Sequence, residues 1–347
     1  MIGLKSDRTC SVATLWLLGL TGAVVALSVG LASSSSFAEG AGLSLSPELV
    51  LINHDPARIV GPDACAECHE KEHEVWMKTA HQADAQTLTR DAEARRIAKA
   101  LGVRRIKTDQ RCAGCHFTTQ QIEGRRPKSV SGVSCESCHN AGEPWMDSHS
   151  VFGPGSATAE SETPEHRAER LAYCDSVGMI RPARLYEIAM ACYTCHAVND
   201  QELVQAAGHP DGAGFEFASW SQGEIRHNFI REGSDRNPRS GQDRLRVMYL
   251  VGAALRLEFA CRAVAEGASV ERVSAALGPL RAIQQAVAID EVSDLIRIGE
   301  AVASASDAAS VIGRVQAIGV SIAGSHIGAD AEPLDALIPD FQGGAGR

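Results

Sequence analysis

Four copies of the pattern Cys-x-x-Cys-His dominate the chemistry that this sequence could perform. They are Cys65/Cys68/His69, Cys112/Cys115/His116, Cys135/Cys138/His139 and Cys192/Cys195/His196. In this pattern two thioethers attach a haem covalently, and the adjacent imidazole binds the haem iron. A histidine follows a Cys-x-x-Cys pair by chance roughly once in thirty, so four coincidences exclude chance. The sequence therefore predicts four covalently attached haem c groups.

Zinc binding is the main alternative, because two Cys-x-x-Cys pairs can also form a tetrahedral thiolate site. That interpretation leaves the four adjacent histidines unexplained, so we favour haem. Three further cysteines, Cys10, Cys174 and Cys261, stand outside the motifs. Cys174 and Cys261 could form a disulfide in an oxidising compartment, but such cysteines are more often buried apolar thiols, which is what we expect here.

The second axial ligand of each iron decides whether a haem only transfers electrons or also binds a substrate. Eight further histidines are available for this role: His54, His73, His81, His149, His166, His209, His227 and His326. His73 lies about 6 Å from His69 along one helix face, so the two cannot bind one iron from opposite sides. His81 would lie about 18 Å along the same helix and, if it is a ligand, serves a different haem.

The elements that position the motifs are predicted to be mainly helical. All four motifs fall within the 132 residues from Cys65 to His196, so the haems must share one core and lie close together. Residues 70–101 lack Gly and Pro and predict one long helix. Two further helices are expected over 164–176 and from 182 into the fourth motif. Strand signals are few.

After residue 242 the pattern changes to an Ala-rich, helical one without further haem motifs. Apolar residues at helical spacing predict four helices that form a bundle over 242–325, with Asp290 and Asp307 as N-caps. The predicted fold class is mainly α, a multihaem cytochrome c domain with little regular sheet followed by this bundle. The predicted divisions are 1–38, 39–241, 242–325 and a loose tail over 326–347. We expect the bundle to brace the haem domain or to form an oligomer.

The N-terminal segment resembles an export signal. Lys5 and Arg8 precede an uncharged stretch that ends in the small-x-small sequence Ser36-Phe37-Ala38, which predicts cleavage after Ala38. Residues 12–32 are also long enough to span a bilayer, so an uncleaved membrane anchor is the alternative. Either way the protein is expected to be periplasmic or otherwise exported.

The formal net charge is −10 at pH 7. This charge disfavours binding to nucleic acid and favours docking to a basic patch on a redox protein partner. A merely soluble acidic surface is the simpler explanation of the same charge.

Residues 60–230 resemble a known family. The order of the four motifs, the run CAECH followed by VWMKTAH, and GVSCESCH with a histidine ten residues after its own resemble the tetrahaem cytochromes of the cytochrome c-554 type. Those proteins accept electrons from hydroxylamine oxidoreductase in ammonia-oxidising bacteria. The resemblance implies that His81 ligates the haem of His139 and His149 that of His69. It also implies stacking of the first haem with the third and the second with the fourth, and an open iron at His116.

The sequence departs from the family pattern after the fourth motif, where His209 and His227 lie in a Gly-rich loop with aromatic residues suited to lining a haem. We assign His209 to the haem of His196. His227 stays open between four roles: the alternative ligand of that haem, the ligand of the second haem, a residue above an open iron, or a partner of a haem propionate. His54 lies in an extended arm that could fold back, and we expect His166 and His326 to be surface histidines.

These features favour an exported tetrahaem cytochrome that relays electrons between periplasmic or membrane redox partners, a carrier rather than a catalyst. No catalytic residue is assigned. The alternative is a haem enzyme that reduces or oxidises a small nitrogen compound at an open second haem, with His227 or another polar group as proton donor. A third interpretation is a subunit of a membrane-bound complex, docked through the bundle.

Overall fold

The computed structural model describes residues 54–341 except 156, 234 and 305–306. The predicted signal or anchor over 1–38 and Cys10 lie outside these residues. As predicted, the described part is mainly α-helical, and its sheet is a single antiparallel pair of strands. Within the same part, no helix is both long enough and apolar enough to cross a membrane.

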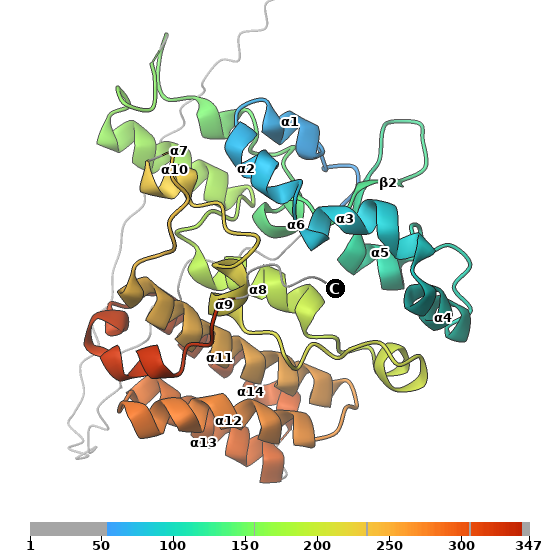
Figure 1. Ribbon diagram of the computed structural model, residues 1–347. Coiled ribbons are helices and arrows are strands. Elements are labelled where there is room, and N and C mark those ends of the chain that lie inside the picture. Colours follow the sequence, from blue (N-terminus) through green and yellow to red (C-terminus); the bar gives the residue numbers. More distant parts are fainter. Residues whose placement is uncertain (1–53, 156, 234, 305–306, 342–347) are drawn as a thin grey trace, which may run out of the picture. The chain divides into compact units, whose positions relative to one another are not determined.

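Residues 54–241, here called the motif region, consist of short helices joined by long loops (Figure 1). The helices are α1 (Pro62–Ala66), α2 (Glu70–Trp76), α3 (Ala80–Thr87), α4 (Ala92–Ala100), α5 (Gln110–His116), α6 (Cys135–His139), α7 (Pro164–Ser176), α8 (Leu185–His196), α9 (Phe217–Ser221) and α10 (Phe229–Glu232). Shorter helical turns are η1 (Leu88–Arg90), η2 (Ser148–Ser150) and η3 (Glu202–Ala206), and the strands are β1 (Thr118–Gln120) and β2 (Lys128–Ser131). The second, third and fourth motifs thus lie at the ends of α5, α6 and α8, whereas the first begins in α1 and ends just before α2.

The predicted single helix over 70–101 is wrong, because the chain forms α2, α3, η1 and α4 there. Two side chains start new helices inside this stretch. The Thr79 hydroxyl accepts from the amide of Gln82, and the Asp91 carboxylate accepts from the amide of Ala94 at 2.8 Å. Thr and Asp cap helix N-termini well, and this local gain competes with a continuous helix. His69 and His81 are therefore not joined by one continuous helix, and their separation is not set by a helical rise.

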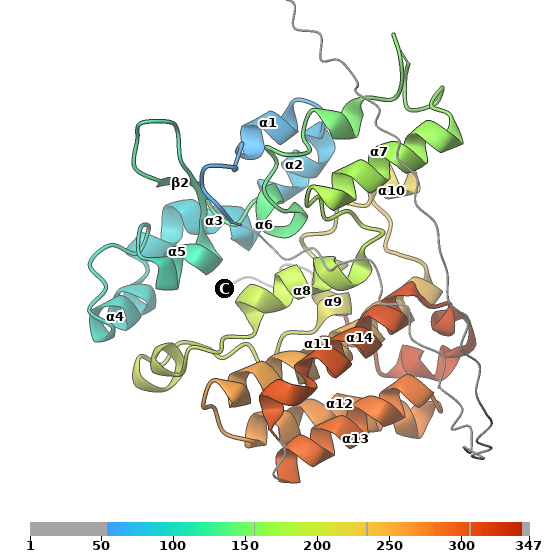
Figure 2. The same cartoon turned by 180° about the vertical axis from the view of Figure 1, so that it is seen from behind.

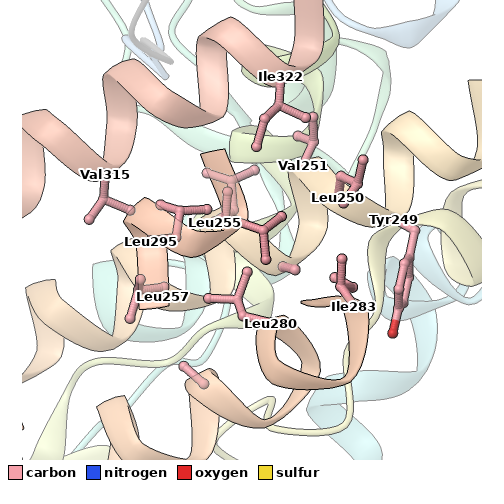
Figure 3. Packing of buried hydrophobic residues seen from close by; sticks show 14 of the residues in the cluster. Tyr249, Leu250, Val251, Leu255, Leu257, Leu280, Ile283, Leu295, Val315 and Ile322 are labelled. Atoms are coloured by element: carbon pink, nitrogen blue, oxygen red, sulfur yellow. The ribbon is translucent and has the colours of Figure 1, made fainter. Parts of the chain in front are cut away.

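The four predicted helices over 242–325 are confirmed as α11 (Gln242–Ala265), α12 (Glu271–Ala286), α13 (Asp290–Ser304) and α14 (Ala308–Gly324). Figures 1 and 2 show them side by side, with α11 in contact with the other three. Their apolar faces meet in one core, part of which is drawn in Figure 3. Asp307 caps α14 as predicted, whereas Asp290 is the first residue of α13 and not its cap.

Helix α8, which carries the fourth motif, packs against α11 and α14. The buried Tyr186 hydroxyl donates a hydrogen bond to the Glu258 carboxylate, which Arg262 neutralises at 2.6 Å. Burial raises the pKa of Tyr186, so the phenol stays a donor. The Tyr193 hydroxyl donates to the Gly252 carbonyl at 2.8 Å. These contacts fix the fourth motif to the bundle.

The end of the described chain differs from the loose tail expected from sequence. Residues 327–336 form the helical turns η4 (Ile327–Asp330) and η5 (Glu332–Ala336), and Leu334 is fully buried. The buried Arg246 guanidinium binds both Asp335 oxygens at 2.7 and 2.8 Å and the Gly328 carbonyl at 2.9 Å. A bidentate pair of this kind holds the segment against α11.

Candidate haem sites

Every motif histidine faces one other histidine. The ring centres lie 6.2 Å apart for His69 and His149, 6.2 Å for His116 and His209, 6.1 Å for His139 and His227, and 6.0 Å for His196 and His81. Below, these pairs are called site 1, site 2, site 3 and site 4, in the order of their motifs.

The spacing of the four pairs fits an iron between two imidazoles. Two imidazoles bound at opposite sides of one metal, with bonds of about 2 Å, have ring centres about 6.3 Å apart. All four observed spacings lie close to this value. The pairs could therefore hold haem irons by two axial histidines each, and the motif cysteines next to them would carry the thioether bonds.

The outer ring nitrogens of four of these histidines bind backbone carbonyls. Nδ1 lies 2.7 Å from a backbone carbonyl oxygen in His139 (Ile180), His209 (Pro210) and His227 (Ile225), and His149 makes the same kind of bond to Met146. A hydrogen bond at Nδ1 fixes the tautomer and directs Nε2 toward a metal. Burial lowers the pKa of His139 and of His196 to about 4, which keeps both rings neutral, as metal ligands must be.

At site 2 the outer ring nitrogen of the motif histidine contacts a carboxylate instead of a backbone carbonyl. The Asp84 Oδ2 atom lies 2.8 Å from Nδ1 of His116, and both side chains are about one third exposed. Sequence reasoning missed Asp84. It follows His81 by three residues on α3, so the two share a helix face, and this spacing was a usable signal. A carboxylate makes the imidazole a stronger electron donor toward a metal than a carbonyl does.

Two of the predicted pairings differ from the structure. His81 faces His196, whereas the family resemblance implied the haem of His139, and His209 faces His116, whereas we assigned it to the haem of His196. His149 faces His69 as the resemblance implied. His227, left open from sequence, faces His139. His209 faces His116, the motif histidine whose iron the resemblance implied to be open.

Close backbone approaches explain these pairings. Gly132, next to β2, touches the His81 carbonyl so closely that any Cβ would overlap it. Gly212 does the same at the His196 carbonyl, with a φ of +80° that also favours glycine. The first contact holds α3 against the hairpin. The second lets the loop of His209 pass directly over the fourth motif.

Sites 1 and 3 are held together by Glu136, the second residue of the third motif, which sequence reasoning also missed. Its fully buried carboxylate accepts from the amides of Val60 at 2.9 Å, Gly61 at 2.8 Å and Gly142 at 2.7 Å. Gly61 immediately precedes α1, the helix of the first motif. Three amide donors are sufficient to stabilise one buried carboxylate.

The sites form a connected series. The Cys65 and Cys135 thiols contact each other, as do those of Cys115 and Cys195, so motif 1 adjoins motif 3 and motif 2 adjoins motif 4. This is the pairing that the family resemblance implied. Helices α6 and α8 are also in contact and bring motif 3 to motif 4. The spatial order is therefore site 1, site 3, site 4, site 2.

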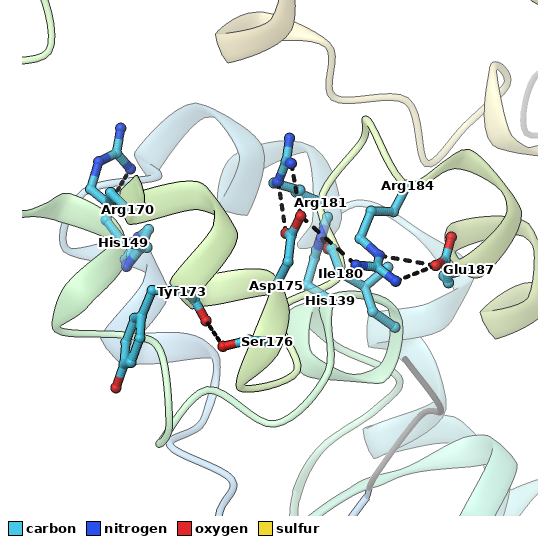
Figure 4. Close-up of polar contacts among 10 residues, drawn as sticks. All are labelled: His139, His149, Arg170, Tyr173, Asp175, Ser176, Ile180, Arg181, Arg184 and Glu187. Carbon is cyan, nitrogen blue, oxygen red and sulfur yellow. Dashed lines mark hydrogen bonds and ion pairs between the residues drawn. The ribbon is translucent and has the colours of Figure 1, made fainter. Parts of the chain in front are cut away.

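Helix α7 supports sites 1 and 3 from one side (Figure 4). Arg170 donates to the His149 carbonyl, and the Ile180 backbone after α7 binds His139. Arg181 and Arg184 bind Asp175 and Glu187, which fixes the turn between α7 and α8. Trp145 packs edge-on to His149, and its buried indole nitrogen has no partner among the described residues, so a haem propionate would fit as its acceptor.

The other histidines have separate contacts. His73 packs against Trp76, His166 binds Glu162 at 2.8 Å, and His54 hydrogen-bonds to the Ser137 backbone. Cys174 and Cys261 are fully buried free thiols, as expected. Across the described part of the chain, no three His, Cys, Asp or Glu side chains are grouped to share a metal ion.

Part of the chain is similar in sequence to known cytochromes. Residues 64–140, which contain the first three motifs, match the family model described as cytochrome c554 and c-prime. The chain is 27% identical over 148 residues to cytochrome c-554 of Nitrosomonas europaea, a match over 40% of this chain and 59% of that protein. The chain thus spans about three fifths of this relative's length. No solved structure matches the chain. The family resemblance is confirmed for the matched part of the chain, and a cytochrome c family implies covalently bound haem c.

Proposed function

We propose that this chain, similar in part to the cytochrome c-554 family, is an exported tetrahaem cytochrome that relays electrons between redox proteins. The observation that carries the proposal is the set of four imidazole pairs, each containing one motif histidine, at 6.0–6.2 Å. In this proposal each pair holds one haem c. The proposed ligand pairs are His69/His149, His116/His209, His139/His227 and His196/His81.

Haem c supplies one-electron redox chemistry, and the chain determines where electrons can travel. Two histidine ligands leave an iron without a position for a substrate, which suits a carrier. The contacts between motifs 1 and 3, 3 and 4, and 4 and 2 support a relay in that order. Electrons would then enter and leave at sites 1 and 2, the two ends of the series.

The remaining parts of the proposal concern location and assembly. The basic, apolar and small-x-small pattern before residue 39 supports export, with a membrane anchor as the alternative fate of that segment. The packing of α8 on α11 and α14 supports a bracing role for the bundle. An oligomer formed through the bundle is a further proposal, tested by the mass of the native protein in mild detergent.

The enzyme alternative requires an open iron at His116. His209 opposite that histidine favours the carrier. Addition of cyanide to the oxidised protein separates the two functions, because a carrier keeps its spectrum and an enzyme with an open haem changes it.

The main experiment is electron paramagnetic resonance of the oxidised protein and of variants in which His81, His149, His209 or His227 is replaced by alanine. We expect four low-spin irons in the wild type and one new high-spin iron in each variant. His73→Ala and His166→Ala are the matched controls and should keep four low-spin signals. Fewer than four haems, or a distal variant that stays fully low-spin, would contradict the proposal.

A further inference from the structure

The segment around the second motif carries a charge opposite to that of the whole protein. Residues 90–128 contain eleven Lys and Arg against four Asp and Glu, a net charge of +7, while the complete chain has −10. The rest of the chain is therefore strongly acidic. The positive charge is concentrated around the second motif, at one end of the proposed relay.

Five of these cations line one hollow. The hollow has a volume of about 680 Å³ and lies between α4 and the loop over residues 102–108. Its five cations, here called the cationic face, are Arg95, Lys99, Arg104, Arg105 and Lys107. All five are exposed. Arg95 and Lys107 donate to backbone carbonyls of Arg90, Asp91 and Ala85. Among the described residues, none of the five forms an ion pair with a carboxylate.

The cationic face is attached directly to the second motif. Val103 and Ile106, which alternate with its cations, pack against Ala113 and Cys112 of α5. The Ser129 hydroxyl donates to the Lys107 carbonyl at 2.6 Å and joins the hairpin to the same surface. That hairpin adds the exposed Arg125, Arg126 and Lys128. Cations therefore lie on the α4, loop and hairpin side of the attachment point of the haem proposed at site 2.

The other end of the series has the opposite charge. Residues 63–74, which contain the first motif, include five Asp and Glu and one Lys. Figures 1 and 2 show that α3 lies between α1 and α2 on one side and α4 and α5 on the other. An acidic partner is repelled at site 1 and attracted at site 2. The screening length of about 8 Å at physiological salt makes the local charge, and not the net charge, decide where a partner docks.

We propose that the cationic face docks the acidic patch of a redox protein, which exchanges electrons with the chain at site 2. This inference rests on the proposed electron relay and adds the terminal site and the charge of one partner. A redox protein is favoured over an anionic lipid surface because the cations lie beside a haem attachment site, where an electron donor or acceptor must approach. The net charge alone had favoured a basic partner, and the local distribution reverses this expectation at this end.

The test uses the full haem-loaded protein and two anionic probes, ferricyanide and a reduced plant-type ferredoxin, which is an acidic redox protein. Stopped-flow rates of electron exchange are measured as a function of ionic strength. A uniformly acidic surface would react faster with anions as salt increases. Reaction at the cationic face gives the opposite sign, a rate that falls with salt for both probes.

The double variant R104E/R105E should lower both rates about tenfold at low salt. The matched control, R297E/R314E, makes the same charge change at exposed positions of the bundle and should leave the rates within about twofold. Unchanged visible spectra and potentials in both variants exclude an effect on the haems. Rates that rise with salt, equal effects of the two variants, or an effect on ferricyanide alone would overturn the inference.

Sedimentation with phosphatidylglycerol vesicles tests the alternative that the cationic face binds an anionic lipid surface. Vesicle binding lost in R104E/R105E, without any effect on the ferredoxin rate, would assign the face to a membrane surface and overturn the inference. If the wild type exchanges electrons with neither probe, the proposed relay itself fails. If it exchanges electrons without dependence on the cationic face, the relay stands and only the docking inference fails.

Discussion

Replacement of Asp84 by asparagine should raise the reduction potential of the haem at site 2 more than that of any other haem. The Asp84 carboxylate contacts the outer nitrogen of His116 at 2.8 Å, so an iron at the inner nitrogen would lie about 7 Å from the charge. At an effective dielectric constant of about 20, one unit charge at that distance favours the oxidised iron by about 2.4 kcal/mol. This corresponds to about 100 mV for one electron.

Solvent reduces this value, because the Asp84 side chain is 29% exposed and that of His116 is 30% exposed. We therefore expect D84N to raise the potential of the haem at site 2 by about 50–100 mV. Asparagine keeps the shape and can still accept the hydrogen bond, so the change reports charge and not a lost contact. The potential at site 4 should rise by less, because Asp84 also lies near His81 on α3 but does not contact its ring. The potentials at sites 1 and 3, none of whose histidines lies on α3, should move by less than about 20 mV.

The assay is a spectroelectrochemical titration, with site 2 identified by the signal that His209→Ala converts to high spin. D91N is the matched control, because asparagine caps α4 as aspartate does and Asp91 contacts no histidine. An unchanged potential in D84N, an equal shift of all four haems, or a shift as large in D91N would refute the reasoning.

Three further predictions concern the scaffold. E136Q should lower the free energy of unfolding by about 2–3 kcal/mol, because at least one of three buried amides loses its acceptor. The control E143Q, at an exposed ion pair, should lower it by less than about 0.5 kcal/mol, and both values are measured by urea unfolding. G212A should produce a high-spin iron, because its Cβ would displace the loop of His209, and G214A, where nothing lies near the added Cβ, should not; equal spectra would contradict the close approach. Arg246 and Gln242 hold the pKa of Asp335 at about 2, below its ordinary value, so this carboxylate stabilises the fold above about pH 4 and progressively less as pH falls toward 2. The stability difference between wild type and D335N should therefore shrink over that interval in urea titrations, and a difference as large at pH 2 as above pH 4 would exclude this ion pair as its cause.

Local patterns predicted the elements that local forces determine. The apolar periodicity after residue 242 predicted the four helices of the bundle, and the helix-forming run over 164–176 predicted α7. The same kind of pattern failed over 70–101, where Thr79 and Asp91 start new helices inside a run without glycine or proline. Both residues are good N-caps, so their positions were informative, but propensity alone does not show which cap will be used.

The candidate ligands could be selected from sequence, but their partners could not. The motif spacing identified His69, His116, His139 and His196, and the loops after the motifs supplied His149, His209 and His227. The pairing of His81 with His196 depends on where α3 lies relative to α8, a long-range contact without a sequence period. In the structure His149 faces the motif histidine that the family resemblance implied, whereas His81 faces a different one. Asp84 and Glu136 were missed because their roles depend on the same long-range contacts.

The pairing of histidines that lie far apart in the sequence has a consequence for biogenesis. The spans from 69 to 149, 81 to 196, 116 to 209 and 139 to 227 all overlap, so every one of them encloses an end of another. Iron ligation across such interleaved loops removes conformational freedom from most of the motif region at once. Maturation is then expected to be all-or-none: omission of one porphyrin would leave two distant segments untied and expose the partly assembled polypeptide to proteases.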